Sequence, residues 1–361
     1  MPKCGTVLGV FCSVEDDQMK IISLRWMQYP VCNSIRPSAG TAIFLLMVFL
    51  LLLPALPASG AARDWPTKQI TVIVPWATGA STDMTPRTLG PRMSKILGVP
   101  IQVVNKPGGS GIMGTLDAVK APPDGYTLLM DCGGTSSIQE AWSENLPYKV
   151  EERTYIARAI SAPLVLIVPA ASPWKTVDDL VQAHRTNPAG ITFGVIGGTG
   201  VPDVDIAQFR AAMVAKGIDI SKTRPVTYKG SGEVGPAIAG GHISYSFTTP
   251  SACKALVGAG KIRALAVSSA QRYKGMPDVP TTAEAGFPSV DMVYWAGFGG
   301  PPGLPATIAK IVDNATKETL TDPDVIDKLD KLGMEPFYLP GDAYRKFVFD
   351  EVKSVKSLKL K

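Results

Sequence analysis

Five short loops of glycine and hydroxyl residues follow predicted strands, and these loops are the segments best suited to bind a ligand. They read WATGASTD at 76–83, DCGGTSS at 131–137, VIGGTGVPD at 195–203, YKGSG at 228–232 and TTPS at 248–251. Backbone N–H groups at the start of a helix bind anions. The first and third loops contain no Lys or Arg. We therefore expect backbone dipoles to hold a carboxylate there.

The predicted grip combines the N–H groups of residues 78–82 with those of residues 197–200, and we expect Gly198→Val to block the close approach of the backbone. One alternative for the first loop is an ordinary strand–helix turn in which Asp83 caps the helix. The full set of predicted ligand-binding residues is Trp76, Thr78, Gly79, Ala80, Ser81, Thr82, Asp83, Gly134, Thr135, Ser136, Gly197, Gly198, Thr199, Gly200, Tyr228, Lys229 and Thr248.

Other chemistry has weaker support in the sequence. GxGxxG occurs at 109–114 and at 230–235, but the first copy is separated from its strand, and the second lacks an acidic residue at the distance a ribose requires. Beyond residue 62 the histidines are His184, expected on a solvated helix face, and His242. No GxSxG elbow and no cluster of metal ligands occurs, so we predict no catalytic residue and no cofactor.

The composition is typical of a globular protein with a sizeable core: 361 residues, 45% hydrophobic, 19% charged, with a net charge of +5. The scattered positive charge does not suggest nucleic-acid binding. The apolar run at 42–53 is short for a membrane span, and small residues follow it. This pattern predicts a secretory signal peptide cleaved so that the chain begins between residues 59 and 64; an uncleaved anchor is the alternative.

Strand and helix patterns alternate along the rest of the chain, from the strand QITVIVPW at 69–76 and the helix at 84–97 to helices near the C-terminus. This alternation predicts an α/β protein with mainly parallel, doubly wound sheets and helices on both faces. About 300 residues suit two such sheets facing a cleft. Cys132 and Cys253 follow the leader, and spacing alone leaves open whether they pair.

The order of several motifs resembles the Bug or TctC family of periplasmic receptors for tripartite tricarboxylate transporters. The motifs are WPTKQITVIVPWATGASTD, VVNKPGGSGIMG, APPDGYTLLM, YKGSGEVGPAIAGG, GKIRALAVSSAQRYKGMPDVPTTAEAGFP and GFGGPPGLP. The resemblance implies a clamp of the periplasmic-binding-protein type, with 1–62 as leader, 63–162 plus 293–361 as domain 1 and 163–292 as domain 2. The chain would cross between the domains near 159–166 and 290–299. It further implies that backbone amides and water bind a carboxylate at facing helix N-termini.

Three positions depart from the family pattern: Ser136 and Asp203 stand where histidine is common, and Thr248 stands where an acidic residue is common. We interpret Asp203 as stabilising its helix start, with contact to a ligand ammonium as the alternative. The resemblance implies a monomeric periplasmic receptor, not an enzyme, that delivers a small organic carboxylate to membrane permease subunits. A periplasmic hydrolase using His242 and a membrane-anchored sensor are the alternatives.

Overall fold

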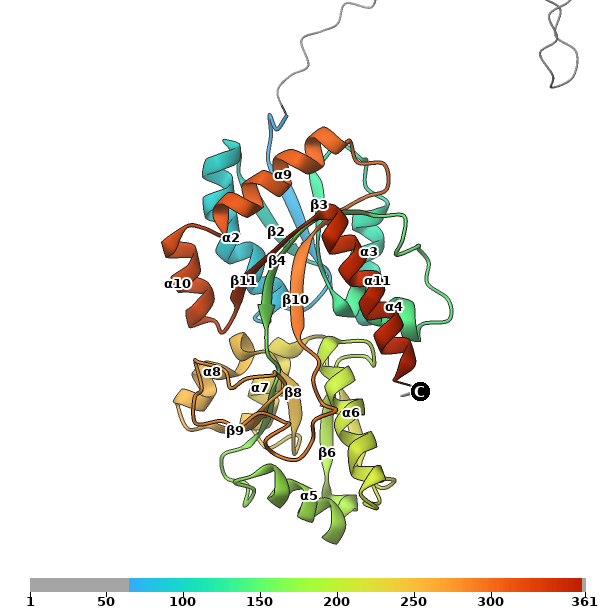
Figure 1. Cartoon of the computed structure of the whole chain (residues 1–361), viewed down its shortest axis with the longest axis vertical. Helices are drawn as coiled ribbons and strands as arrows, with labels where there is room; N and C mark the ends of the chain where they lie inside the picture. Colours follow the sequence, from blue (N-terminus) through green and yellow to red (C-terminus); the bar gives the residue numbers. More distant parts are fainter. Residues whose placement is uncertain (1–64, 359–361) are drawn as a thin grey trace, which may run out of the picture. The chain divides into compact units, whose positions relative to one another are not determined.

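A six-stranded sheet organises the larger lobe of the described chain, residues 65–358 of this computed structural model (Figure 1). We call this part the large-sheet lobe. Its strands, in the order β11-β4-β10-β3-β1-β2, are β11 (Glu335–Pro340), β4 (Thr154–Ala162), β10 (Tyr294–Gly300), β3 (Thr127–Cys132), β1 (Ile70–Val74) and β2 (Ile101–Asn105). The helices of this lobe are α2 (Ser81–Leu97), η1 (Gly109–Gly111), α3 (Ile112–Val119), η2 (Gly133–Thr135), α4 (Ser137–Trp142), α9 (Ala306–Thr319), α10 (Pro323–Lys331) and α11 (Gly341–Ser357).

Two smaller sheets form the second lobe, which we call the small-sheet lobe. An antiparallel sheet has the order β8-β5-β9, and β6 pairs in parallel with β7. These strands are β5 (Val165–Pro169), β6 (Thr192–Val195), β7 (Arg224–Thr227), β8 (Ser246–Thr248) and β9 (Ile262–Val267). The helices are α5 (Val177–Thr186), η3 (Pro188–Gly190), α6 (Val201–Ala215), α7 (Ser231–Ala239) and α8 (Pro250–Gly258).

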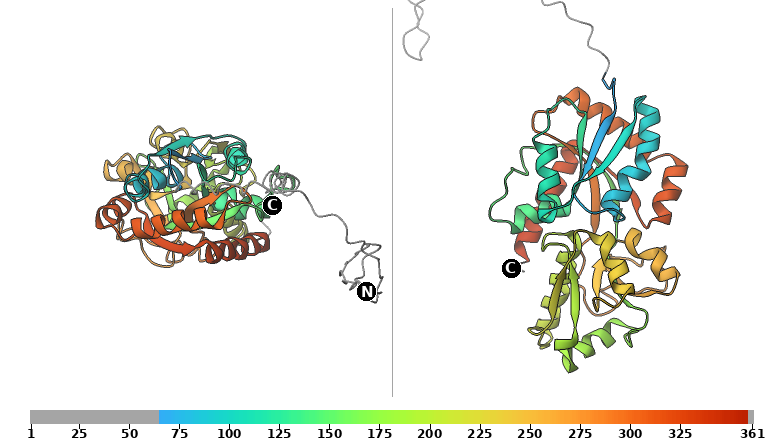
Figure 2. Two further views of the ribbon diagram at one scale, coloured as in Figure 1. Left: turned by 90° about the horizontal axis from the view of Figure 1, so that it is seen from above. Right: turned by 180° about the vertical axis from the view of Figure 1, so that it is seen from behind.

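The α/β class with two lobes is confirmed, although strand directions are more mixed than the alternation of strands and helices indicates. β1 runs parallel to β2 and β3, whereas β10 is antiparallel to both β3 and β4. β4 and β10 lie side by side; β4 runs toward the junction of the lobes, and β10 returns from it (Figures 1 and 2). Strands that connect the lobes are not tied to a right-handed crossover helix and can therefore pair antiparallel.

Sheet membership changes between β4 and β5, which only Pro163 and Leu164 separate, and again between β9 and β10. The exact domain boundaries stay a prediction. The predicted leader and its cleavage site lie outside the described residues.

His184 is buried, so the prediction of a solvated helix face is wrong. Its Nδ1 lies 2.8 Å from the carbonyl oxygen of Leu180, and its ring meets Tyr245 edge-on at 5.4 Å. Burial lowers the pKa of His184. The apolar residues Val177, Leu180 and Val181 precede it at helical spacing and face the same core. That spacing places position 184 on the inner face of α5.

Glu351 fastens α11 to the six-stranded sheet. Its Oε2 accepts hydrogen bonds from Trp295 Nε1 at 2.8 Å and from the Ser137 hydroxyl. Burial raises the pKa of this carboxyl to about 7 from an ordinary value of 4.5, against the opposing effect of both hydrogen bonds. The folded protein therefore holds a proton here that the unfolded chain releases.

We expect the free energy of unfolding to fall as pH rises from about 5.5 to 7, by about 1–2 kcal/mol from Glu351. Between the two pKa values the folded state binds more protons than the unfolded state, so raising the pH favours unfolding. Urea unfolding at several pH values measures the slope. Glu351→Gln is the control and should flatten this part of the profile; an unchanged slope in that variant would assign the dependence to other groups.

Candidate functional site

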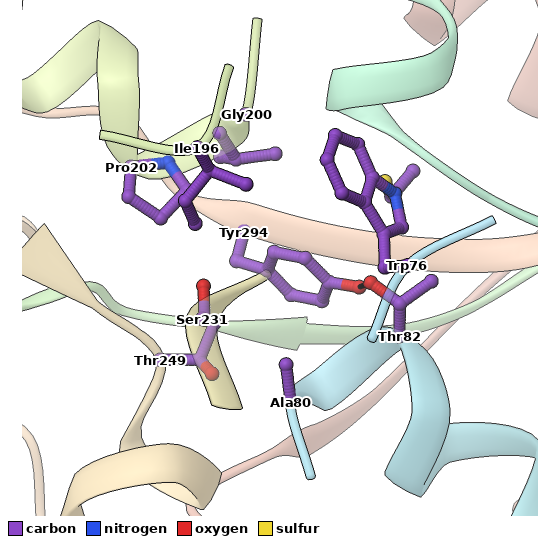
Figure 3. Close-up of a pocket in the computed structure, with 11 residues that line it drawn as sticks. Trp76, Ala80, Thr82, Ile196, Gly200, Pro202, Ser231, Thr249 and Tyr294 are labelled. Atoms are coloured by element: carbon purple, nitrogen blue, oxygen red, sulfur yellow. Dashed lines mark hydrogen bonds between the residues drawn. The ribbon is translucent and has the colours of Figure 1, made fainter. Parts of the chain in front are cut away.

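A small central cavity lies where the two lobes meet (Figure 3). Its volume is about 20 Å³, room for about one water molecule. The large-sheet lobe lines it with Trp76, Ala80, Thr82, Cys132 and Tyr294, and the small-sheet lobe with Ile196, Gly200, Val201, Pro202, Ser231 and Thr249. The first turns of α2 and α6 both contribute to this wall, as the sequence indicates for loops 76–83 and 195–203.

Polar groups from three segments reach the central cavity. The Thr82 hydroxyl and the Tyr294 hydroxyl lie 2.6 Å apart, as Figure 3 shows. The indole N–H of Trp76 is buried beside the Cys132 thiol, and it bonds to no nitrogen or oxygen acceptor among the described residues. Because a thiol sulfur is a weak acceptor, Trp76 is suited to donate instead to a ligand oxygen.

Asp83 organises the loop before α2 and is not among the residues that line the cavity. It lies in the first turn, because α2 begins at Ser81 with Ala80 at the N-cap rather than at Met84. Its Oδ2 accepts the N–H of Gly79 at 3.0 Å, and its Oδ1 accepts from Asn105 Nδ2 at 3.0 Å and Arg87 Nε at 2.8 Å. The carboxylate thus fixes the loop against its helix.

Asp203 has the same role on the other lobe. It lies in the first turn of α6, is buried, and accepts the N–H groups of Ile196 at 2.6 Å and Gly200 at 2.9 Å. Burial raises the pKa of Asp203 to about 6, against the lowering effect of these N–H groups. Asp203 therefore stabilises the helix start, as we interpreted it from the sequence.

These two aspartates reduce the number of backbone N–H groups that are available to bind a carboxylate. The N–H groups of Gly79 and Gly200 already bond to Asp83 and Asp203. The N–H groups of Ser81, Thr82 and Val201 have no partner inside their own helices, because they belong to first turns. Thr82 and Val201 line the same cavity as Trp76, so their first-turn amides and the indole supply several donors to one site.

Comparison with known proteins identifies the family of this chain. The family model described as "Tripartite tricarboxylate transporter family receptor" (TctC) matches residues 86–360. The chain belongs to this family. A Cupriavidus necator protein named "UPF0065 protein in gbd 5'region" is 31% identical over 308 residues, covering 85% of this chain and 91% of that protein.

Two solved structures share the fold of this TctC family member. "Structure of a periplasmic transporter" is 32% identical with a TM-score of 0.76 and covers 81% of this chain and 97% of its own. "R. palustris Rpa4515 with adipate" is 28% identical with a TM-score of 0.77 and covers 82% and 97%. Family and neighbours are periplasmic binding proteins. Among residues 65–358, no helix has the length and apolar character that crossing a bilayer requires.

A second cavity of about 310 Å³ shares Trp76 with the central one. The predicted residues Gly197, Tyr228 and Lys229 line it, together with Gly108, Gly109, Ser110, Gly111 and Thr227, which our predicted set did not include. We call it the glycine-loop cavity. Ser110 Oγ donates to the carbonyl of Gly197 at 3.0 Å and so joins the lobes at its edge.

Gly198 differs from its predicted role. It is exposed, its φ is +84°, and a Cβ there would meet no atom within 4 Å. Gly198→Val would strain the backbone, but its side chain would not project against any neighbouring atom. The substitution is therefore a poor test of the site. Thr199 is only partly buried, but its hydroxyl oxygen is buried without a hydrogen-bond partner in the described chain.

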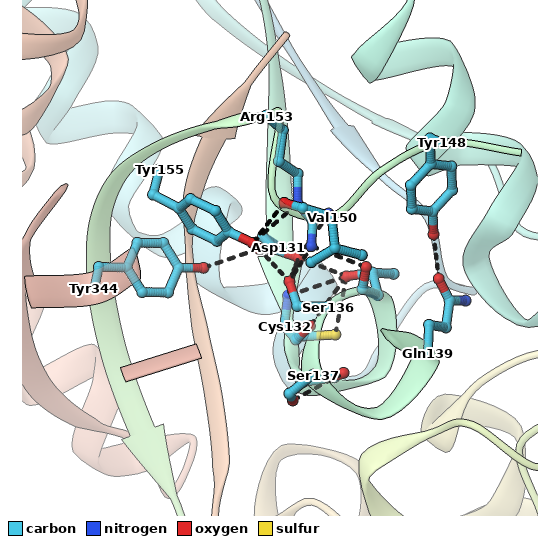
Figure 4. Close-up of polar contacts among 12 residues, drawn as sticks. Asp131, Cys132, Ser136, Ser137, Gln139, Tyr148, Val150, Arg153, Tyr155 and Tyr344 are labelled. Carbon is cyan, nitrogen blue, oxygen red and sulfur yellow. Dashed lines mark hydrogen bonds and ion pairs between the residues drawn. The ribbon is translucent and has the colours of Figure 1, made fainter. Parts of the chain in front are cut away.

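Thr135 and Ser136 belong to a buried polar cluster around Asp131 rather than to the cavity wall (Figure 4). Asp131 accepts from the Thr135 hydroxyl at 2.7 Å, from Ser136 at 2.6 and 2.8 Å and from Tyr344 at 3.2 Å. Arg153 Nη1 completes it at 3.4 Å from Asp131 Oδ1. Gly134 lies nearer the site, where a Cβ would meet Trp76 at 2.8 Å.

The hydroxyl of Thr248 faces the carbonyl of Ser231 at 3.5 Å, and its neighbour Thr249 lines the cavity. Thr78 is exposed on the loop. Tyr294 is the main residue that sequence reasoning missed. Its only signal in the sequence is its place inside the second predicted crossing, where β10 begins.

Residues considered for other chemistry are placed differently. His242 is exposed in the turn after α7 and does not line the central cavity. Burial raises the pKa of the Cys132 thiol to about 11, which keeps it protonated. Cys132 and Cys253 carry free thiols. Residues 65–358 contain no group of three or more His, Cys, Asp or Glu residues that could hold a metal ion.

Proposed function

We propose that this TctC receptor captures a small dicarboxylate between its two lobes and delivers it to membrane permease subunits. The carrying observation is the central cavity, where the buried Trp76 N–H, whose neighbouring acceptor is only a thiol, and two helix first turns from opposite lobes meet. A carboxylate is the ligand that such uncharged donors recognise. The relative solved with adipate supports this class of ligand.

The second carboxylate of the ligand would extend past Trp76 toward the glycine-loop cavity. Lys229 lines that cavity and supplies the positive charge that the central cavity lacks. Backbone and indole N–H groups would then bind one carboxylate of the ligand, and the Lys229 ammonium group would bind the other.

Entry of the ligand requires the lobes to separate, because about 20 Å³ does not hold a dicarboxylate. Ser81 Oγ and Ser251 Oγ, 2.9 Å apart, join α2 to α8 across the junction in the closed arrangement. We infer a hinge in the two connections between the lobes, β4 to β5 and β9 to β10. Export by a cleaved signal peptide and a monomeric state are part of the same proposal.

We expect Trp76→Phe to weaken adipate binding about 10-fold, because a charge-assisted hydrogen bond contributes about 1.5 kcal/mol or more. The phenyl ring keeps most of the apolar contact and removes the N–H. Isothermal titration calorimetry with adipate, malate and succinate measures the loss.

Trp174→Phe is the matched control, since Trp174 packs in the small-sheet lobe and does not line the central cavity. It should bind as the parent protein does. Equal affinity of Trp76→Phe and the parent would place the carboxylate elsewhere. Absence of heat with every dicarboxylate would count against the ligand class itself.

A further inference from the structure

A third cavity, of about 430 Å³, lies between α11, α6 and the segment that leads into β10. We call it the rear cavity. The C-terminal end of α11 approaches α6 in Figure 1 and in the right view of Figure 2. Its wall shares no residue with the wall of the central cavity. The rear cavity is therefore a separate candidate for a ligand.

Arg158 supplies a buried positive charge to the rear cavity. Its side chain is on β4, only 5% of the residue is exposed, and its Nε has no hydrogen-bond acceptor among residues 65–358. The guanidinium lies 4.2 Å from the ring centre of Phe337 and 4.3 Å from that of Phe347. The two rings stabilise the cation but cannot accept its N–H bond in the plane, and the Glu351 carboxyl interacts with its charge without bonding to Nε, so this N–H still lacks an acceptor.

Two carboxyl groups face the same cavity. Glu351 uses its Oε2 for Trp295 and Ser137, and Asp291 uses its Oδ1 for Gln208 Nε2 at 3.1 Å. Each carboxyl group has a second oxygen that none of these bonds occupies. The rear cavity therefore contains one cation, Arg158, and two carboxyl oxygens that can accept hydrogen bonds from a ligand.

Apolar side chains complete the rear cavity. Met292 and Val293 come from the segment before β10, and Val355 and Leu358 from the end of α11. The rear cavity thus offers a cation, two carboxyl groups and an apolar surface. A ligand that matches all three carries a carboxylate, a positively charged donor and an apolar group.

We propose that the rear cavity binds a small zwitterion, an α-amino acid with an apolar side chain. Its carboxylate pairs with Arg158, its ammonium group with Glu351 and Asp291, and its side chain packs on Met292, Val355 and Leu358. A dicarboxylate of the kind proposed for the central cavity does not fit, because its second charge would meet the two acidic residues. The proposal does not depend on the ligand of the central cavity.

The test uses protein labelled with 5-fluorotryptophan and fluorine NMR, because Trp295 lines the rear cavity and Trp76 the central one. Trp295→Phe and Trp76→Phe assign the two resonances. Leucine at about 10 mM, well above a weak Kd of about 1 mM, should shift the Trp295 resonance and leave Trp76 in place. 4-Methylpentanoate, which lacks the ammonium group, and 3-methylbutylamine, which lacks the carboxylate, should bind at least about 10-fold more weakly.

Arg158→Met should abolish the leucine shift while the other fluorotryptophan resonances keep their positions, which shows that the fold is intact. Asp291→Asn is a second variant and should weaken leucine binding about 10-fold, because it removes the charge of the other acidic residue in the wall. A Trp295 resonance that leucine does not move, or moves equally in Arg158→Met, would overturn the site. Equal affinity for leucine and 4-methylpentanoate would overturn the proposal that the ligand is a zwitterion.

Discussion

Gly232→Ala is expected to weaken dicarboxylate binding about 10- to 100-fold while each lobe stays folded. Gly232 lies in the first turn of α7, and a Cβ there would stand 2.1 Å from the carbonyl oxygen of Thr78 on the other lobe. The obstacle is backbone and cannot rotate away. Overlap of this kind costs about 1–3 kcal/mol in the closed arrangement only. Calorimetry with adipate and small-angle scattering measure affinity and closure together.

Gly258→Ala is the matched control, because Gly258 ends α8 in the same lobe and a Cβ there meets no atom within 4 Å. Its affinity should equal that of the parent protein. If Gly232→Ala binds adipate normally and contracts normally on binding, the contact between Gly232 and Thr78 does not form in the liganded state.

Asp131→Ala is expected to lower the free energy of unfolding by about 3–5 kcal/mol, the usual cost of leaving a buried partner charge uncompensated. Arg153 lies 3.4 Å from Asp131, and both side chains are 1% exposed. The hydroxyls of Thr135, Ser136 and Tyr344 lose their acceptor at the same time. Urea unfolding followed by circular dichroism measures the change.

Glu152→Ala removes an exposed partner, from a pair in which Lys149 Nζ lies 2.6 Å from Glu152, and should cost less than about 1 kcal/mol. The double variant Asp131→Ala with Arg153→Met should be less destabilised than the sum of its single changes. Additive losses, or a loss for Asp131→Ala as small as that for Glu152→Ala, would show that the ion pair contributes little.

The sequence was sufficient to predict which loops reach the central cavity. Strand ends followed by small residues and a helix start identify Trp76, Ala80, Thr82 and Gly200, because such loops meet at one edge of their sheets. It was not sufficient to assign Thr135, whose hydroxyl serves the interior. A hydroxyl side chain has the same sequence signature whether it faces a ligand or a buried aspartate.

Contacts between distant segments account for the remaining omissions. Tyr294 reaches Thr82 only because β10 returns from the small-sheet lobe into the large sheet between β3 and β4. No local pattern records that pairing, and the same strand introduces the antiparallel pairs that alternation did not predict. His184 is different, since helical spacing with Val177, Leu180 and Val181 already indicated its burial.

The small volume of the central cavity has a kinetic consequence. The ligand that we propose to lie between the lobes leaves only after they part, so its dissociation rate cannot exceed the rate of opening. Ligands of very different affinity would then share the same maximum dissociation rate. They would differ in the fraction of openings during which the ligand escapes. For a receptor that hands over its cargo, residence time would be set by whatever partner surface opens the lobes. Under the proposed function, we expect handover to be fast at the membrane and slow in free solution.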